Sequence, residues 1–221
     1  MGLMPHLRKS FRTNFSIQPY GAPLRLASDG RRDHGNRRMS ATAPARMTAD
    51  EFIAWAMQQP EGQRYELVAG EVVGMAPERA AHARLKGRVY EALGRAIRAA
   101  DAPCEAFPDG MTVRIDSDTV YEPDALVRCG SPLDDNAVEA PDPLVVVEVV
   151  SPSSARRDSG SKLEGYFRIP SVRHYLIVTT RNLAVIHHHR DDAGGITTRI
   201  IREGAIRLDP PGIELTGLFQ V

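Results

Sequence analysis

Two carboxylates occupy segments of this chain where an acidic side chain is unexpected. Glu148 lies inside the apolar run 144–150, which reads as a strand buried on both faces, and Asp124 follows Pro123 in a second strand-like run, 121–127. An unpaired buried carboxylate costs several kcal/mol. A divalent cation such as Mg²⁺ would offset both charges, because it prefers hard oxygen ligands.

Each acid also has an ordinary explanation. Glu148 could pair with a buried arginine, and Asp124 could serve only as a turn residue at the start of a strand. For either acid alone the ordinary explanation is favoured, whereas the two together favour a metal site. Glu66 and Glu71, from a predicted hairpin, could approach the same site, although exposed hairpin acids are the usual case.

His82 is a further polar candidate. It opens a helical segment in which Leu85, Val89 and Leu93 repeat with helical spacing, and it projects onto that apolar side. The side chain therefore points inward. It is either a hydrogen-bonded core histidine or a polar group beside the site.

The elements that must position these side chains alternate between helices and strands. The form Thr48-Ala49-Asp50-Glu51 is typical of a capping box at a helix start. We expect, in order, a short helix from residue 48, a hairpin over 65–73 that turns at Ala69-Gly70, a helix over 82–100, strands over 111–115, 121–127 and 144–150, a helix over 159–169, a strand over 173–178, and antiparallel segments at 183–188, 196–201 and 213–215. A strand–helix–strand unit implies a right-handed crossover, so strands 144–150 and 173–178 should be parallel. The fold class is α/β or α+β with a mixed sheet.

Charge divides the chain at about residue 47. Residues 1–47 hold nine Arg or Lys and two acids, so the other 19 basic and 26 acidic side chains give residues 48–221 a net charge of −7. The first segment lacks any apolar period, and we interpret it as a disordered basic extension of a domain that spans 48–221. The acidic domain weakens any argument for nucleic-acid affinity from charge alone.

The composition indicates a soluble cytoplasmic protein. No apolar run reaches the roughly 18 residues of a membrane span, and no signal-peptide core is present. Cys104 and Cys129 have neither zinc-site spacing nor a disulfide framework, so we expect reduced thiols.

Four phrases of the sequence, in order, resemble one known family. They are Arg64-Tyr65-Glu66-Leu67-Val68-Ala69-Gly70-Glu71, Glu122-Pro123-Asp124, Glu148-Val149-Val150-Ser151-Pro152-Ser153-Ser154 and Lys162-Leu163-Glu164-Gly165-Tyr166. Over about residues 48–216 the chain is similar to the Uma-two family of restriction-endonuclease-like proteins, within the PD-(D/E)XK nuclease superfamily. The resemblance implies the αβββαβ nuclease core, with Asp124 on its second strand and Glu148 on its third.

One position departs from the superfamily pattern. The lysine expected two residues after the acid is Val150 here, on the same face of the strand as Glu148. The resemblance implies that the lysine has moved to the next helix as Lys162, four residues before Tyr166 and on the same helical face.

The resemblance implies metal-dependent hydrolysis of nucleic-acid phosphodiesters, with DNA as the first expectation. Asp124 and Glu148 would hold Mg²⁺, or Mn²⁺ in vitro, and Lys162 would orient or deprotonate the attacking water. Tyr166 and His82 would be accessory groups that position the others. Arg156 and Arg157 could contact phosphate, or lie in a solvated loop. His187, His188 and His189 cannot share one face of a strand, so a metal site formed by all three is not expected.

Two other functions fit the same residues. A nuclease fold could bind nucleic acid without cutting it, as the missing strand lysine and the acidic domain suggest, or it could serve as a protein-interaction module. Membrane partners are not expected. The sequence does not set the oligomeric state, and a homodimer is kept open.

Overall fold

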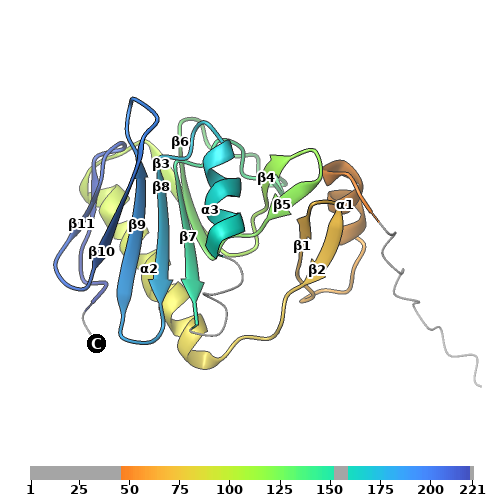
Figure 1. Cartoon of the computed structure of the whole chain (residues 1–221), viewed down its shortest axis with the longest axis horizontal. Helices are drawn as coiled ribbons and strands as arrows, with labels where there is room; N and C mark the ends of the chain where they lie inside the picture. Colours follow the sequence, from red (N-terminus) through yellow and green to blue (C-terminus); the bar gives the residue numbers. More distant parts are fainter. Residues whose placement is uncertain (1–45, 152–158, 220–221) are drawn as a thin grey trace, which may run out of the picture. The chain divides into compact units, whose positions relative to one another are not determined.

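A computed structural model describes residues 46–151 and 159–219. These residues form three helices and twelve strands (Figure 1). In chain order the elements are α1 (Ala49–Ala56), β1 (Tyr65–Val68), β2 (Glu71–Gly74), α2 (Ala80–Ala99), β3 (Cys104–Pro108), β4 (Val113–Asp116), β5 (Thr119–Tyr121), β6 (Ala125–Cys129), β7 (Val145–Val150), α3 (Ser159–Arg168), β8 (His174–Thr179), β9 (Ala184–Arg190), β10 (Ile196–Ile201), β11 (Ile206–Leu208) and β12 (Ile213–Leu215).

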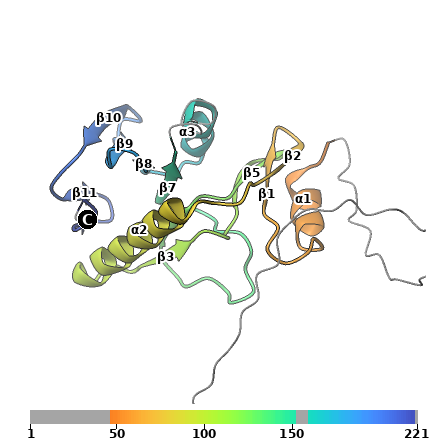
Figure 2. The ribbon, with the colours of Figure 1, turned by 90° about the horizontal axis from the view of Figure 1, so that it is seen from below.

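The main sheet has six strands in the order β10-β9-β8-β7-β6-β3. β7 and β8 are parallel, as predicted for strands joined through a helix, and the other neighbours are antiparallel. Helices α2 and α3 lie on opposite faces of this sheet (Figure 2). The mixed α+β architecture expected from the sequence is therefore confirmed.

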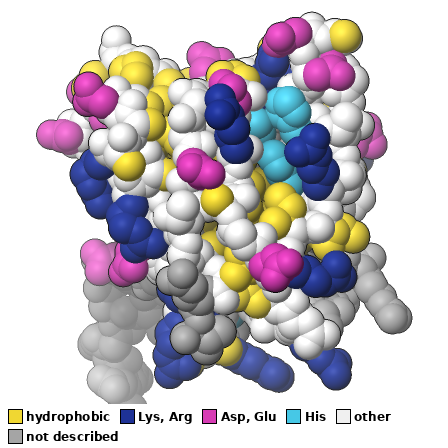
Figure 3. Space-filling model, turned by 90° about the vertical axis from the view of Figure 1, so that its left-hand side faces the viewer, with side chains coloured by type: hydrophobic (Ala, Val, Ile, Leu, Met, Phe, Trp, Pro, Cys, Tyr) yellow, Lys and Arg dark blue, Asp and Glu magenta, His cyan; other side chains and the backbone are white. Residues whose placement is uncertain are grey.

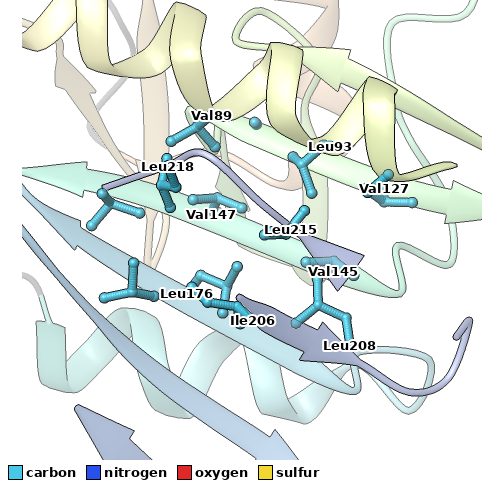
Figure 4. Close-up of a cluster of buried hydrophobic side chains, with 14 of the residues drawn as sticks. Val89, Leu93, Val127, Val145, Val147, Leu176, Ile206, Leu208, Leu215 and Leu218 are labelled. Carbon is cyan, nitrogen blue, oxygen red and sulfur yellow. The ribbon is translucent and has the colours of Figure 1, made fainter. Parts of the chain in front are cut away.

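Alternation along β7 separates two hydrophobic clusters. Val145, Val147 and Val149 face α2 and pack with Leu85, Val89 and Leu93, among others (Figure 4). Val146 belongs to the cluster on the other face, with Tyr166 of α3. Glu148 is two residues after Val146, so it lies on the same face of β7 and projects toward α3.

Local sequence explains the N-terminal elements. The Thr48 hydroxyl accepts from the Glu51 amide while the Glu51 carboxylate accepts from the Thr48 amide, which is the predicted capping box. The hairpin turns at Ala69 and Gly70, both with positive φ, as a tight two-residue turn requires.

The strands of the nuclease core differ from those predicted. The run 121–127 is divided into β5 and β6, and Asp124 lies at the bend just before β6 rather than within a strand. β4, predicted as the first core strand, pairs instead with β5 in a separate sheet of order β2-β1-β5-β4. The edge position in the main sheet is taken by β3, which the sequence analysis missed because Pro108 and small residues interrupt any apolar alternation.

The prediction of reduced cysteines is wrong for this structure. Cys104 of β3 and Cys129 of β6 are directly opposite each other and form a disulfide. The error follows from the missed strand, because without β3 nothing placed the two thiols side by side.

Met47 lies just before the predicted domain boundary at residue 48 and packs into the core. Met47 is buried against Phe52, Leu67 and Val120, and its amide donates to the Gly70 carbonyl. Residues 1–45 lie outside the described residues.

We therefore expect two truncations to behave differently. Removing residues 1–45 should leave the thermal unfolding midpoint unchanged, because that segment lacks an apolar period with which to join a core. Removing residues 1–47 should lower it, since the buried Met47 side chain contributes about 2 kcal/mol or more. Calorimetry on both proteins tests this, and equal midpoints would refute a structural role for Met47.

Candidate active site

Asp124 lies at the centre of a buried polar cluster. Its Oδ2 accepts a hydrogen bond from the Val149 amide at 2.6 Å, which fixes the carboxylate against the backbone of β7 next to Glu148. Its Oδ1 lies 2.7 Å from Nζ of Lys86. His82, half-buried at the start of α2, points inward as expected, with Nε2 3.6 Å from Asp124 Oδ2.

Lys86 is a site residue that the sequence analysis missed. Its ammonium contacts Glu78, Asp109 at 2.9 Å and Asp124, and one oxygen from each of these three acids lies within 4.8 Å of the other two. A signal was present, because Lys86 lies three residues before Val89 on the apolar side of α2. It is also one of only three lysines in the chain.

Glu148 is surrounded by donors from α3. Nζ of Lys162 lies 2.8 Å from Glu148 Oε1, and the Tyr166 hydroxyl donates to the same oxygen at 2.7 Å. Lys162 also donates to Glu66 Oε1 at 2.8 Å. The structure thus brings Lys162 and Tyr166 to Glu148, so Lys162 places beside this acid the ammonium group that Val150 lacks. Glu66 reaches the site from the hairpin, whereas Glu71 is exposed.

Arg64 and Glu122 connect the contacts around Lys162 with those around Lys86. Glu66 accepts from the Glu122 amide at 2.9 Å, and Arg64 donates to Glu122 at 2.6 Å and to Asp109 at 2.7 Å. A continuous chain of contacts therefore runs from Lys162 to Lys86. We call the whole set the acidic network: Arg64, Glu66, Glu78, Lys86, Asp109, Glu122, Asp124, Glu148 and Lys162.

The acidic network holds more acids than permanent cations. Six carboxyl groups face three basic side chains. Burial raises the pKa of Glu148 to about 7, and the charges of Asp124 and Glu66 add to this, while Lys162 opposes it. Burial also raises the pKa of Glu122. Glu66, Glu122, Asp124 and Glu148 are buried, Asp109 is partly buried and Glu78 is exposed. A divalent cation would offset such a surplus of partly buried negative charge.

The remaining pKa shifts keep the other partners charged. Burial acts to raise the pKa of Asp124, but His82 and Lys86 outweigh it and hold that pKa below its usual value. Burial acts to lower the pKa of Lys162 and of Lys86, but their carboxylate partners raise both pKa values above the usual range. Both ammonium groups therefore keep their protons at neutral pH.

The raised pKa of Glu148 predicts a pH dependence. Between about pH 4.5 and 7 the folded state keeps a proton on Glu148 that the unfolded state has lost, so this group's contribution to stability falls as pH rises. Glu148→Gln mimics the protonated acid. In EDTA, the free energy of unfolding of Glu148→Gln should therefore increase relative to that of wild type as the pH rises from about 4.5 to 7, by up to roughly 3 kcal/mol in total. Urea unfolding of both proteins at several pH values measures this difference in free energy. A difference that does not change with pH would contradict the raised pKa of Glu148.

Not every predicted residue can be placed. Arg156 and Arg157 lie outside the described residues. The alternation expected of the three consecutive histidines is confirmed, because His188 faces Tyr175 and Thr198 while His187 contacts His174 on the other face.

Comparison with known proteins identifies the family. The family model Uma2, described as "Putative restriction endonuclease", matches residues 49–218. The chain belongs to the Uma2 family. The four phrases that suggested this membership include Glu66, Asp124, Glu148, Lys162 and Tyr166, which meet in the acidic network or donate to it.

Two curated relatives of this Uma2 chain come from Synechocystis sp. (strain ATCC 27184 / PCC 6803 / Kazusa). Uncharacterized protein slr1290 is 27% identical over 158 residues, which cover 70% of this chain and 80% of the relative. Uncharacterized protein sll1609 is 28% identical over 163 residues, which cover 72% and 90%.

A solved structure shares the fold. It is described as a "putative nuclease belonging to DUF820" from Anabaena variabilis ATCC 29413, and the two align with a TM-score of 0.58 at 15% identity. The alignment covers 78% of this chain and 97% of that one. Within the described residues, no helix has the length and apolar character that crossing a membrane requires.

Proposed function

We propose that this Uma2 protein is a metal-dependent endonuclease that hydrolyses nucleic-acid phosphodiester bonds, with DNA as substrate. The observation that carries the proposal is the acidic network, in which six carboxyl groups surround two buried lysines. Of its members, Glu66, Glu122, Asp124, Glu148 and Lys162 belong to the four phrases that resemble the family. A structural role alone would be served better by a balanced set of charges, or by apolar side chains of similar volume.

The donor set fits a hard divalent cation. Carboxylate oxygens are the ligands that Mg²⁺ and Mn²⁺ prefer, and Asp124 and Glu148 would hold the ion. Asp124 also belongs to the group with Glu78 and Asp109, which offers a second set of oxygens. Such an ion, when bound, supplies polarisation of the scissile phosphate and a lower pKa for attacking water.

Lys162 would act as a cation and hydrogen-bond donor rather than as a base. Its raised pKa keeps the proton in place, so the ammonium can donate to a phosphate oxygen or orient a water. Glu66 fixes the position of the ammonium, and the Tyr166 hydroxyl fixes Glu148. His82 lies close enough to Asp124 to restrict its orientation.

A non-cutting nucleic-acid-binding protein is the second candidate. The valine at position 150 and the acidic domain favour it. In that case Arg156 and Arg157 would contact phosphate as they would in the nuclease, but no hydrolysis would follow.

Cleavage separates the two candidates. Purified wild-type protein is incubated with DNA and RNA substrates in Mg²⁺, Mn²⁺ or EDTA, beside Asp124→Asn. The nuclease predicts metal-dependent cleavage that falls about 10³-fold or more in the variant, because the ion supplies several kcal/mol to the transition state. Binding without cleavage of any substrate would favour the second candidate.

A further inference from the structure

A pocket of about 200 Å³ lies on the sheet face opposite to Glu148 and Lys162. His174 of β8 and His187 and His189 of β9 project from this face, as Leu176 and Val185 do. Figure 3 views this side of the molecule and shows histidine side chains at the surface between basic side chains. The full lining is His174, His187, His189, Thr197, Arg199, Arg207 and Asp209.

The hydrogen bonds fix the proton positions on two of the rings. His174 Nε2 lies 2.7 Å from the Pro210 carbonyl oxygen, which can only accept, so this nitrogen carries the proton. His174 Nδ1 then accepts from His187 Nε2 at 2.9 Å. Burial lowers the pKa of His174 to about 3 and that of His187 to about 4, so both rings are neutral at physiological pH. His187 Nδ1 is left as a lone pair.

The third ring is incompletely satisfied. His189 stacks on His174 with ring centroids 4.8 Å apart, and its Nε2 is shielded from solvent without a hydrogen-bond partner among the described residues. A buried ring nitrogen without a partner is uncommon and calls for a ligand or a water. His189 also lines the pocket, so a ligand there lies against this ring.

The charges at the pocket favour an anion over a metal ion. Arg207 is paired with Asp209 at 2.9 Å, so the charge of Arg199 is left in excess and lowers the pKa of His187. The lining thus carries two guanidinium groups against one carboxylate, and this net positive charge repels a cation. In addition, no three metal-ligating atoms of this pocket approach within 4.8 Å of one another in the described part of the chain.

We propose that this pocket binds a phosphate group, held by Arg199 and Arg207 and lying against the His189 ring. The planar guanidinium presents paired N–H groups that match phosphate oxygens. The volume has room for roughly six water molecules, and a phosphate group is smaller than that. The phosphate belongs either to a free anion or nucleotide, or to a nucleic-acid strand lying across this face. This pocket is separate from the acidic network, and phosphate binding in it does not depend on cleavage at the network.

Titration calorimetry in EDTA with three probes tests the proposal: inorganic phosphate, a deoxynucleoside 5′-monophosphate and a single-stranded oligodeoxynucleotide. At least one should bind wild type saturably. The double variant Arg199→Ala with Arg207→Ala should weaken that binding 10-fold or more, whereas Arg95→Ala, an exposed arginine of α2, should not. The probe that binds should shift the side-chain NMR signals of His187 and His189 in wild type, and the double variant should lose these shifts.

The affinities for the three probes together show which kind of molecule carries the phosphate. Similar affinities for inorganic phosphate and the mononucleotide indicate a free anion, and binding of the oligonucleotide alone indicates a strand phosphate. The proposal is overturned if no probe binds wild type, or if the arginine variant binds as tightly as wild type. In a separate titration without EDTA, Zn²⁺ binding that survives both arginine changes, with no phosphate binding by wild type, would replace the anion site by a metal site.

Discussion

Replacing Lys162 by alanine is expected to lower the free energy of unfolding by about 3–5 kcal/mol in EDTA. The ammonium is the shared partner of Glu66 and Glu148, each at 2.8 Å, and its loss leaves two buried carboxylates facing each other. This differs from the behaviour of an ordinary solvated lysine, whose replacement stays within about 0.5 kcal/mol. Cleavage, measured well below the melting temperature, should fall roughly 10²-fold or more.

Two further variants separate charge from chemistry. Arg168→Ala, on the exposed side of the same helix, should change neither stability nor cleavage substantially, since its partners are surface acids. Lys162→Arg keeps the positive charge and should recover part of the stability, but not the cleavage, because a guanidinium does not present the same compact donor. Full cleavage by Lys162→Ala would reject the assigned role of this lysine.

Replacing Lys86 by methionine is the second change with a large expected effect. Methionine keeps the length of the side chain but removes the charge that Glu78, Asp109 and Asp124 share, so stability in EDTA should fall by about 3 kcal/mol. The unpaired carboxylates should then take a cation more readily. Saturating Mg²⁺ should therefore raise the melting temperature of Lys86→Met more than that of wild type.

Arg84→Met is the matched control, because Arg84 is an exposed residue of the same helix. It should leave both the melting temperature and the Mg²⁺ response as in wild type. The expectation fails if Lys86→Met is as stable as wild type in EDTA, or if Mg²⁺ raises both melting temperatures equally.

Local sequence patterns were sufficient for much of the fold. The capping box at Thr48, the turn at Ala69-Gly70 and the apolar stripe of α2 each depend on residues close in the chain, and the structure has all three. The parallel pairing of β7 with β8 also followed, because a helix between two strands leaves few other connections. β3 was missed because a short edge strand needs no apolar alternation.

The acidic network was predicted only in part, for a physical reason. Glu148 was visible because a charge in an apolar run is conspicuous. Lys86 was hidden among the arginines of α2, and the burial of Lys162 depends on Glu66, which is 96 residues away in the chain. Such contacts depend on how whole helices and strands pack together, so no short-range sequence pattern predicts them.

The most direct test of the account is a Mn²⁺ titration by calorimetry of wild type, Asp124→Asn, Glu148→Gln and Glu78→Gln. We expect saturable binding in wild type, its loss in Asp124→Asn and in Glu148→Gln, and its retention in Glu78→Gln. Loss in Glu78→Gln with retention in Glu148→Gln would move the ion to the group of Glu78, Asp109 and Asp124. Binding that is unchanged in both Asp124→Asn and Glu148→Gln would contradict the metal site and the nuclease mechanism built on it.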